Sequence, residues 1–586
     1  MDPHSYSNPG EVRVRHISLD VDVRFEARVL EGSATLSFDA PQDDTLVLDT
    51  RGLVIHAAEG ASADGAWHPA NFELGAEDGI LGAPLWVHLA AGDRRVRIAY
   101  TTSPGATALQ WLAPAQTAGK QHPFLYTQSQ AIHARSWMPA QDTPAVRVTY
   151  DARIRTPLPL VAVMSAEMRH GAGEHHFHMP QPVPTYLIAL AVGDLAFAPL
   201  GARSGVYAER LMLARAAHEF ADTEAMIAAV ERLYGPYRWG RYDLLVLPPS
   251  FPFGGMENPR LTFVTPTMIA GDRSLVSLVA HELAHSWSGN LVTNATWEDF
   301  WLNEGFTVYL ERRILEEVYG ADRARMEACL GRRELERELG RLPPPDTVLH
   351  LDLKGRDPDD GCTLVPYEKG FLLLKRLEAI HGRTRFDAFL RSYFEAFVFQ
   401  SVTTNEFVSY LSKHLASDGI CWEEWLTAPG LPADAPGAPS EGLSQVEEQA
   451  AAWLDGRLPL AEIPASSWTV HEWLHFLRSM PQPLPPGRMQ ELDGAFFLTR
   501  AGNAEVLHQW LLMAVRSGYQ PALAALEPFL ISVGRRKFVR PLYEELVRTP
   551  EGRDLAAAIY ARAREGYHPI AQATVDAILK VPATGC

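Results

Sequence analysis

The chain has 586 residues, about twice the length at which a single hydrophobic core stops growing, so we expect three domains. Its net charge is −18, from 53 basic and 71 acidic side chains. A surface of this sign repels phosphate backbones and anionic lipid headgroups, which argues against nucleic-acid and membrane partners.

Cysteine usage indicates a reducing compartment. The four cysteines show no C-x-x-C spacing and predict no disulfide framework. The N-terminal segment has no basic stretch followed by an apolar one, and no apolar run is long enough to span a bilayer. We therefore expect a cytoplasmic protein. The cysteines are Cys329, Cys362, Cys421 and Cys586.

The first third of the chain is predicted to be a β domain, residues 1–196. Apolar and polar residues alternate at 17–25, 34–38, 96–100 and 146–150, as in half-buried antiparallel strands. Turns that contain proline and glycine separate these segments.

The middle part, residues 197–427, mixes strand and helix. A strand is predicted at 244–247. Helices are predicted at 274–289 and 303–319, and each of these segments ends at or just before a glycine.

Prolines and glycines cluster at 428–442, which we interpret as a linker. The alternative is a long surface loop inside one domain. In residues 443–586, apolar side chains recur three and four positions apart, a pattern typical of packed helix pairs. The clearest segments are 504–516, 521–532, 539–548 and 551–566.

The strongest chemical motif is His281-Glu282-Leu283-Ala284-His285, which lies in a predicted helix. Residues four positions apart share one helical face, so both imidazoles reach one metal ion and Glu282 reaches a water beside it. Catalytic zinc takes three protein ligands, and Glu304, at the start of the next predicted helix, is the third candidate. Glu311, two turns further on, is placed to hydrogen-bond a ligand histidine. The sequence predicts one zinc per chain; the alternative is two histidines at this spacing by chance.

These motifs resemble the M1 family of zinc aminopeptidases, in particular the subgroup that contains leukotriene A4 hydrolase and aminopeptidase B. The resemblance extends over nearly the whole chain, through QSQAIH at 128–133, PPSFPFGGMENP at 248–259, WLNEG at 301–305, VPYEKG at 365–370 and GRRKFVRP at 534–541. It implies a multidomain α+β protein with a saddle-like N-terminal β domain, a thermolysin-like catalytic domain and a C-terminal α-helical domain of the HEAT or armadillo type.

The resemblance also implies a peptide-binding site. Glu257, helped by Gln130, would bind the free α-ammonium of the substrate, and Tyr367 would donate a hydrogen bond to the oxyanion. Taken alone, Glu257 would be a solvated acid and Tyr367 a core aromatic. Further substrate-binding residues implied in this way are Ala131, Gly254, Gly255, Met256, Asp359, Arg535 and Lys537.

Three of these residues imply substrate preferences. Arg535 and Lys537 would bind the terminal carboxylate of a short peptide, although Arg-Arg-Lys is more often a solvated helix end. Asp359 would favour an N-terminal arginine or lysine; otherwise it is a turn residue.

The predicted activity is removal of the N-terminal residue from short peptides, with Glu282 as general base. We expect a monomer whose partner is a peptide with a free N-terminus. Alternatives are a lipid epoxide hydrolase of the leukotriene A4 hydrolase type, a zinc endopeptidase and a catalytically dead binding module. Cys362 stands where the lipid-converting enzyme has a second tyrosine, so we expect weak lipid conversion.

Overall fold

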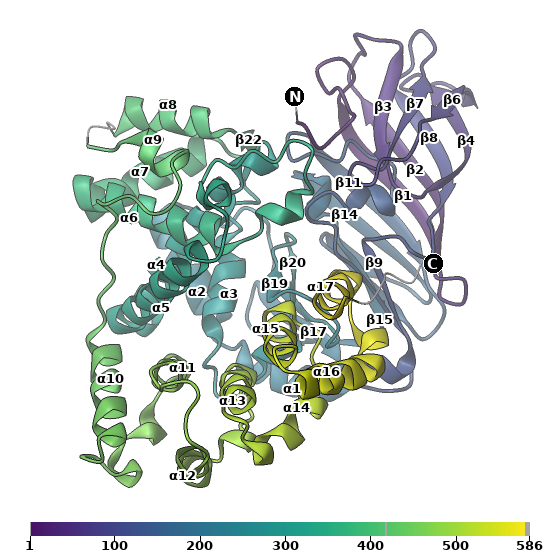
Figure 1. Ribbon diagram of the computed structural model, residues 1–586. Coiled ribbons are helices and arrows are strands. Elements are labelled where there is room, and N and C mark those ends of the chain that lie inside the picture. Colours follow the sequence, from purple (N-terminus) through teal and green to yellow (C-terminus); the bar gives the residue numbers. More distant parts are fainter. Residues whose placement is uncertain (1, 416–418, 581–586) are drawn as a thin grey trace.

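The computed structural model describes residues 2–415 and 419–580. Strands fill the N-terminal third, a mixed α/β part follows, and helices form the C-terminal part (Figure 1). Cys586 lies outside the described residues, and Cys329, Cys362 and Cys421 are free thiols.

The N-terminal domain is built on an eight-stranded sheet. Alternate side chains of its long strands are buried, as the period-two pattern predicts. One pairing differs from the expected antiparallel arrangement, because β1 lies parallel to β11, with Ile17 opposite Tyr150. Strands distant in sequence are adjacent here, which alternation alone does not reveal. In sheet order the strands are β13 (Glu167–His170), β14 (Glu174–Pro184), β11 (Arg147–Arg155), β1 (Val14–Arg24), β2 (Val29–Phe38), β8 (Arg95–Thr101), β4 (Val54–Ala61) and β5 (His68–Pro69).

Two smaller sheets complete this domain. One of them contains β10 (Phe124–Thr127), and the chain continues from the end of β10 into segment 128–133, which contains the predicted substrate-binding residues Gln130 and Ala131. The first consists of β3 (Thr45–Thr50), β7 (Ala83–His88) and β6 (Phe72–Leu74). The second consists of β12 (Val161–Met164), β15 (Leu190–Gly193), β10 (Phe124–Thr127) and β9 (Leu109–Leu112).

A five-stranded sheet opens the middle domain, and the predicted boundary at residue 196 falls inside its first strand. Its strands in order are β16 (Leu195–Pro199), β17 (Ser204–Glu209), β18 (Tyr242–Val246), β20 (Leu261–Val264) and β19 (Gly255–Met256). A pair, β21 (Val292–Asn294) and β22 (Gln400–Val402), lies apart from it. The helices are α1 (Arg210–Glu219), α2 (Thr223–Tyr234), α3 (Val276–Ala284), α4 (Trp301–Tyr319), α5 (Ala321–Leu339), α6 (Gly370–His381), α7 (Arg383–Ala396), α8 (Thr404–His414) and α9 (Trp422–Leu426).

Helix α3 is shorter than the predicted 274–289. It ends at Ala284 with His285 as its C-cap, and the chain then turns back toward α4. Gly289 still has a structural role, since its φ is +103° and a Cβ there would collide with the side chain of Asn303. Gly289 therefore permits the close approach of this turn to α4. It does not end α3, which stops at Ala284.

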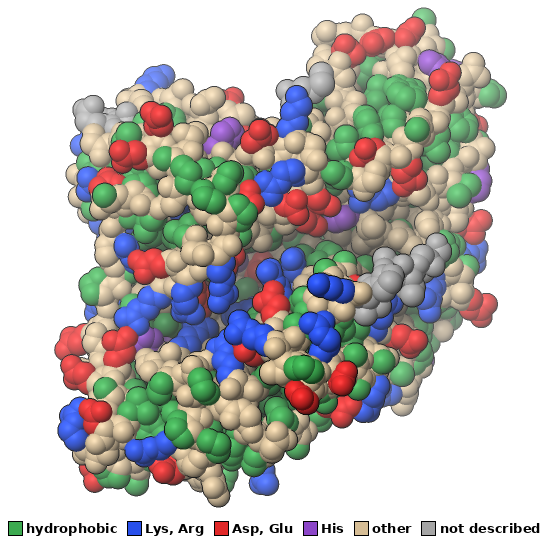
Figure 2. Space-filling model, in the orientation of Figure 1, with side chains coloured by type: hydrophobic (Ala, Val, Ile, Leu, Met, Phe, Trp, Pro, Cys, Tyr) green, Lys and Arg blue, Asp and Glu red, His purple; other side chains and the backbone are tan. Residues whose placement is uncertain are grey.

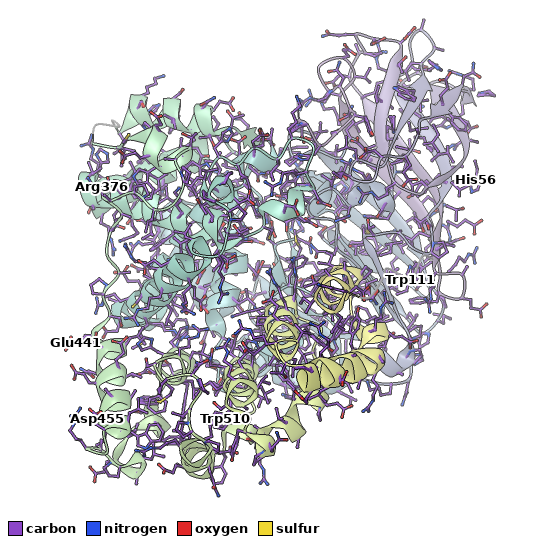
Figure 3. The ribbon with its side chains drawn as sticks, in the orientation of Figure 1. His56, Trp111, Arg376, Glu441, Asp455 and Trp510 are labelled. Carbon is purple, nitrogen blue, oxygen red and sulfur yellow. The ribbon has the colours of Figure 1, made fainter. Side chains whose placement is uncertain are left out.

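Residues 427–440 form neither helix nor strand, and the C-terminal helices begin after them. These helices have a hydrophobic core of their own, in which Trp510 is fully buried. Figure 3 shows Trp510 inside this domain, and Glu441 and Asp455 at the two ends of α10. The helices are α10 (Glu441–Leu454), α11 (Val470–Arg478), α12 (Pro486–Phe496), α13 (Ala504–Ser517), α14 (Gln520–Ser532), α15 (Arg536–Leu546), α16 (Pro550–Ala563) and α17 (Pro569–Leu579).

Ion pairs join the helical domain to α5 of the middle domain. His471 Nε2 lies 2.6 Å from Glu327 Oε1, and Arg478 Nη1 lies 2.6 Å from Glu334 Oε1. These contacts bring α13 and α15 opposite the active-site helices (Figure 1). Across the described ranges, we find no helix with the length and hydropathy that crossing a membrane requires.

Candidate active site

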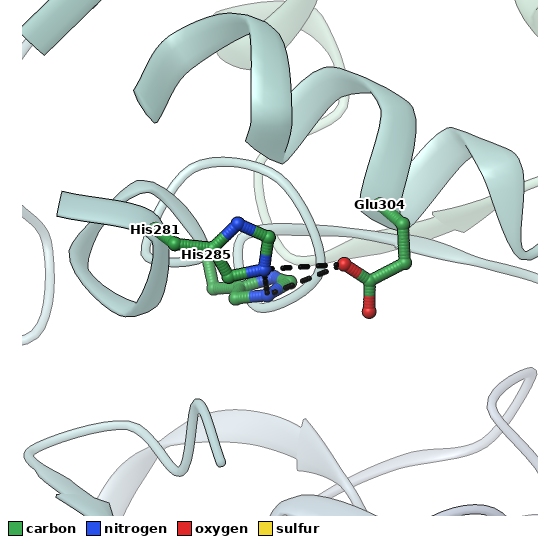
Figure 4. A group of neighbouring side chains, drawn as sticks. All are labelled: His281, His285 and Glu304. Carbon is green, nitrogen blue, oxygen red and sulfur yellow. Dashed lines mark hydrogen bonds and ion pairs between the residues drawn. The ribbon is translucent and has the colours of Figure 1, made fainter. Parts of the chain in front are cut away.

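Helices α3 and α4 pack against each other and bring three metal-binding side chains together (Figure 4). His281 Nε2 and His285 Nε2 are 3.2 Å apart. Glu304 Oε2 lies 3.4 Å from His281 Nε2 and 3.6 Å from His285 Nε2. Glu304 is in the first turn of α4, where the helix dipole favours a carboxylate.

The triangle of donor atoms fits a zinc ion. Tetrahedral zinc with bonds of about 2.0–2.1 Å has edges of about 3.3–3.4 Å between its ligand atoms, close to the three distances above. Glu304 Oε2 is buried and, among the described residues, accepts no hydrogen bond. Two imidazoles and one carboxylate are the donor set of many catalytic zinc sites.

Both histidines are oriented by contacts at their other ring nitrogen. His281 Nδ1 is 2.9 Å from Glu311 Oε2, as the spacing along α4 predicts. His285 Nδ1 is 3.1 Å from the carbonyl oxygen of Ser288. When Nδ1–H donates to these acceptors, the Nε2 lone pair is directed at the metal position. Burial also lowers the pKa of His285 to about 4, which keeps the imidazole neutral.

Glu282 faces the same space from α3. Its side chain packs against Gly255, where a Cβ would collide with the Glu282 carboxylate. A glycine is therefore needed at position 255 of β19, because a side chain there would overlap the carboxylate of Glu282. Glu282 is buried, its Oε2 has no hydrogen-bond partner among the described residues, and burial raises its pKa well above the usual range. A carboxylate with a raised pKa is a suitable general base.

Glu257 follows β19 and lies beside this group. Asn290 Nδ2 donates to the Glu257 carbonyl at 2.7 Å and fixes the backbone. The Glu257 carboxylate is buried, its Oε1 is unpaired within the described chain, and burial raises its pKa. Ligand atoms of Glu257, Glu282 and His285 all lie within 4.8 Å of one another. The carboxyl group of Glu257 therefore lies beside the metal position, together with those of Glu304 and Glu282.

Tyr367 lies in a π-helical turn, Val365–Lys369, that packs against α4. A Cβ on Gly305 would lie 2.7 Å from Gly370 Cα, so this pair of glycines permits the close approach. The Tyr367 ring stacks on His281 at 6.1 Å, and burial raises the pKa of the phenol well above 10. The phenol therefore keeps its proton and is able to donate a hydrogen bond toward the metal position.

A cavity of about 430 Å³ contains this group of side chains. Met256 is the one predicted site residue that does not line it: its sulfur accepts a hydrogen bond from Gln128 Nε2 at 3.4 Å, on the far side of β19. The predicted residues that do line the cavity are Gln130, Ala131, Gly254, Gly255, Glu257, His281, Glu282, His285, Glu304, Asp359, Tyr367, Arg535 and Lys537.

The outer predicted residues already have protein partners. Asp359 Oδ2 lies 3.3 Å from His133 Nε2. Glu505 Oε1 accepts hydrogen bonds from Arg535 Nη1 at 3.3 Å and Lys537 Nζ at 2.8 Å. The two cations lower the pKa of Glu505 to about 2, against the effect of burial. Sequence reasoning missed Glu505 because it is 30 positions from Arg535 and no local pattern joins them.

Cys362 also faces the cavity, with its sulfur 3.8 Å from the Tyr367 hydroxyl. The Cys362 side chain is exposed to the cavity, and the surrounding protein raises the pKa of its thiol above the usual range, with a further contribution from Asp359. The thiol is therefore protonated at neutral pH. Cavity residues that the sequence did not indicate include Phe253, Trp297, Phe300 and Arg536.

The fold and the site together define a zinc metallopeptidase. The Peptidase M1 N-terminal domain matches residues 3–187, and the Peptidase family M1 domain matches residues 218–425. A third match, described as Leukotriene A4 hydrolase, C-terminal, covers residues 468–579.

Relatives match the chain over its whole length. Leukotriene A-4 hydrolase of Xenopus laevis is 37% identical and covers 100% of both chains. Leucine aminopeptidase 2 of Yarrowia lipolytica is 39% identical over 98% of this chain and 93% of its own. The structure of yeast LTA4 hydrolase in complex with bestatin superposes with a TM-score of 0.93 at 35% identity, over 99% of this chain and 97% of that one. The chain belongs to peptidase family M1 and is a zinc aminopeptidase.

Proposed function

We propose that this aminopeptidase removes the first residue of short peptides, with His281, His285 and Glu304 holding one zinc ion per chain. The observation that carries the proposal is the buried Glu257 carboxyl group beside the metal triad, whose Oε1 has no hydrogen-bond partner among the described residues. A buried charge is costly without a partner, and the α-ammonium of a peptide would be that partner. Because Glu257 is so close to Glu282, an ammonium bound there places the first peptide bond at the metal.

The proposed chemistry uses three side chains around that bond. When bound, zinc lowers the pKa of a water molecule and polarises the scissile carbonyl. Glu282 accepts the proton of the attacking water and passes it to the leaving amine. The Tyr367 phenol donates a hydrogen bond to the carbonyl oxygen as negative charge develops on it. Gln130 lines the cavity, and its side-chain amide oxygen is proposed to accept a hydrogen bond from the substrate N-terminus.

Residues at the outer wall of the cavity would determine which peptides bind. Arg535 and Lys537 are proposed to bind the terminal carboxylate, in competition with Glu505, and Asp359 to favour an N-terminal arginine or lysine. A cytoplasmic protein without nucleic-acid partners remains our prediction from composition and cysteine usage. We also expect a monomer.

Epoxide hydrolysis of a lipid is the second candidate. Two relatives bear the name leukotriene A4 hydrolase, and the cavity has polar and apolar walls beside the metal triad. Cys362 lies next to Tyr367, at the position where the lipid-converting enzyme has a second tyrosine. A thiol is smaller and less polar than a phenol and lacks the packing area of its ring. We therefore propose the peptide reaction as the main activity.

The substitution Glu257→Gln tests the proposed function. In the parent enzyme we expect a free tripeptide to be cleaved far faster than its N-acetylated form, because only the free ammonium pairs with Glu257. The variant should lower kcat/KM for the free peptide by about ten- to a hundredfold, the range for a lost charged hydrogen bond. Hydrolysis of both peptides by mass spectrometry is the measurement. A parent enzyme that cleaves both equally well would refute the exopeptidase proposal.

A further inference from the structure

Asn290 connects the metal-binding segment to the segment that carries Glu257. Its backbone N–H donates to the carbonyl of His285, the second histidine of the metal triad, at 3.0 Å. Its side-chain Nδ2 donates to the Glu257 carbonyl at 2.7 Å. Asn290 is buried and does not line the cavity, so any effect it has on a substrate passes through these two neighbours. Two hydrogen bonds from one residue thus link Glu257 to the metal position.

Arg147, the first residue of β11, binds Asn290 from the β domain. Its Nη2 donates to the Asn290 carbonyl at 2.5 Å, and its Nη1 donates to Thr293 Oγ1 at 2.6 Å. On the side of its own domain, Nε and Nη2 donate to the Pro182 carbonyl at 3.1 and 2.9 Å. The planar guanidinium therefore joins β14 of the β domain to the turn of the middle domain that contains Asn290.

The charge of Arg147 is buried, and all its hydrogen bonds run to neutral oxygens. Within the described part of the chain it forms no ion pair with a carboxylate. Burial lowers the pKa of its guanidinium to about 9, which still leaves the group charged at neutral pH. Figure 2 shows other Lys and Arg side chains on the surface, gathered along the hollow between the helical and middle domains. Arg147 differs from those side chains because it is buried between two domains.

The pKa of Tyr186 shows which charges are near Arg147. Burial raises the pKa of this phenol well above its usual value. The negative charges of Glu257 and Glu304 raise it further, and the positive charge of Arg147 opposes them. The Tyr186 hydroxyl also donates to the carbonyl of Gly289 at 3.4 Å. Arg147 and the two active-site carboxylates therefore lie in one buried region of the protein.

We propose that Arg147 and Asn290 are positioning residues that hold Glu257 at the distance from the metal at which it binds the substrate ammonium. Arg147 acts through Asn290, and Asn290 acts through the backbone of Glu257. This inference rests on the proposed aminopeptidase function. It makes recognition of the free N-terminus depend on a contact between the β domain and the middle domain. The effect is measurable because a displacement of about 1 Å at a reacting group can cost about 10²-fold in rate.

The experiment compares two ligands of the zinc-loaded enzyme, leucine hydroxamate and its des-amino analogue. Both bind a metal through the hydroxamate, and only the first carries an α-ammonium. Calorimetric titration gives the two Kd values, whose quotient we call the ammonium ratio. The variants are Arg147→Met, Arg147→Lys, Asn290→Ala and the double variant Arg147→Met with Asn290→Ala. Arg153→Met is the matched control, since Arg153 is on the same strand and pairs with Asp20 at the surface.

We expect the parent to bind the ammonium-bearing ligand at least about tenfold more tightly, the scale of one charge-assisted hydrogen bond. Arg147→Met and Asn290→Ala should each remove most of this ratio, with zinc content and the Kd of the des-amino analogue unchanged. Arg147→Lys should keep part of the ratio, and Arg153→Met should keep all of it. Because the two residues act in one chain of hydrogen bonds, the double variant should lose no more than the more affected single variant. A general loss of structure would instead weaken both ligands.

The proposal is overturned if both single variants keep an ammonium ratio within about twofold of the parent ratio, or if their losses multiply in the double variant. Should Arg147→Met fail to fold, Arg147→Lys and Asn290→Ala decide by the same criterion. Failure of the proposed function looks different: the parent would bind the two hydroxamates equally well, or Glu257→Gln would keep the parent ratio.

Discussion

Replacing Glu282 by glutamine is expected to lower kcat by about 10²–10⁴-fold, the usual cost of losing a general base. Glutamine has nearly the same shape and keeps the packing against Gly255, but its amide does not accept the proton of the attacking water. Steady-state hydrolysis of an unmodified tripeptide, measured near neutral pH, checks this expectation.

Zinc content is the control for this variant. Glu282 is not one of the three converging ligands, so Glu282→Gln should bind as much zinc as the parent. A variant that retains its zinc and hydrolyses the peptide within threefold of the parent would show that another group is the base.

Tyr367→Phe is expected to lower kcat by about 10²–10³-fold, the cost of removing one donor to an oxyanion. The ring should keep its stacking on His281 and its edge contact with Phe300, so substrate binding and KM should change little. Within the described part of the chain, the hydroxyl has one hydrogen-bond partner, the thiol of Cys362 at 3.8 Å.

The ratio of the two kinetic effects distinguishes the roles of Tyr367. A rise in KM with an unchanged kcat would mean that the phenol binds the ground state and does not stabilise the transition state. Equal loss of kcat and zinc would mean that the ring mainly supports His281. Cys362→Ala is the matched control, because it removes the neighbouring polar group and leaves the phenol in place.

The metal triad was predictable because its spacing is local. His281 and His285 share one helical face, and Glu304 lies in the first turn of the next helix, so two consecutive helices complete the set. The β domain was predictable for the same reason, since alternation reports the buried face of each strand. The length of α3 was not, because its end is determined by a turn that packs Gly289 against Asn303 of α4.

Local sequence patterns do not predict contacts between residues that are far apart in the chain. Glu505 on α13 neutralises Arg535 and Lys537 at the start of α15, and His133 of the β domain contacts Asp359 of the middle domain. Arg536 has the same residue type as Arg535 and differs only in what lies around it. The sequence alone therefore does not distinguish Arg535, Arg536 and Lys537, three of the four basic residues of GRRKFVRP.

Metal analysis of the purified protein, beside a His285→Ala variant, tests the central claim most directly. The account predicts about one zinc per parent chain and, for the variant, a loss of most of that zinc together with the peptidase activity, because one of three protein ligands is gone. Less than about half a zinc per parent chain with no gain of activity on adding zinc, or a His285→Ala variant that keeps its full zinc content, would contradict it.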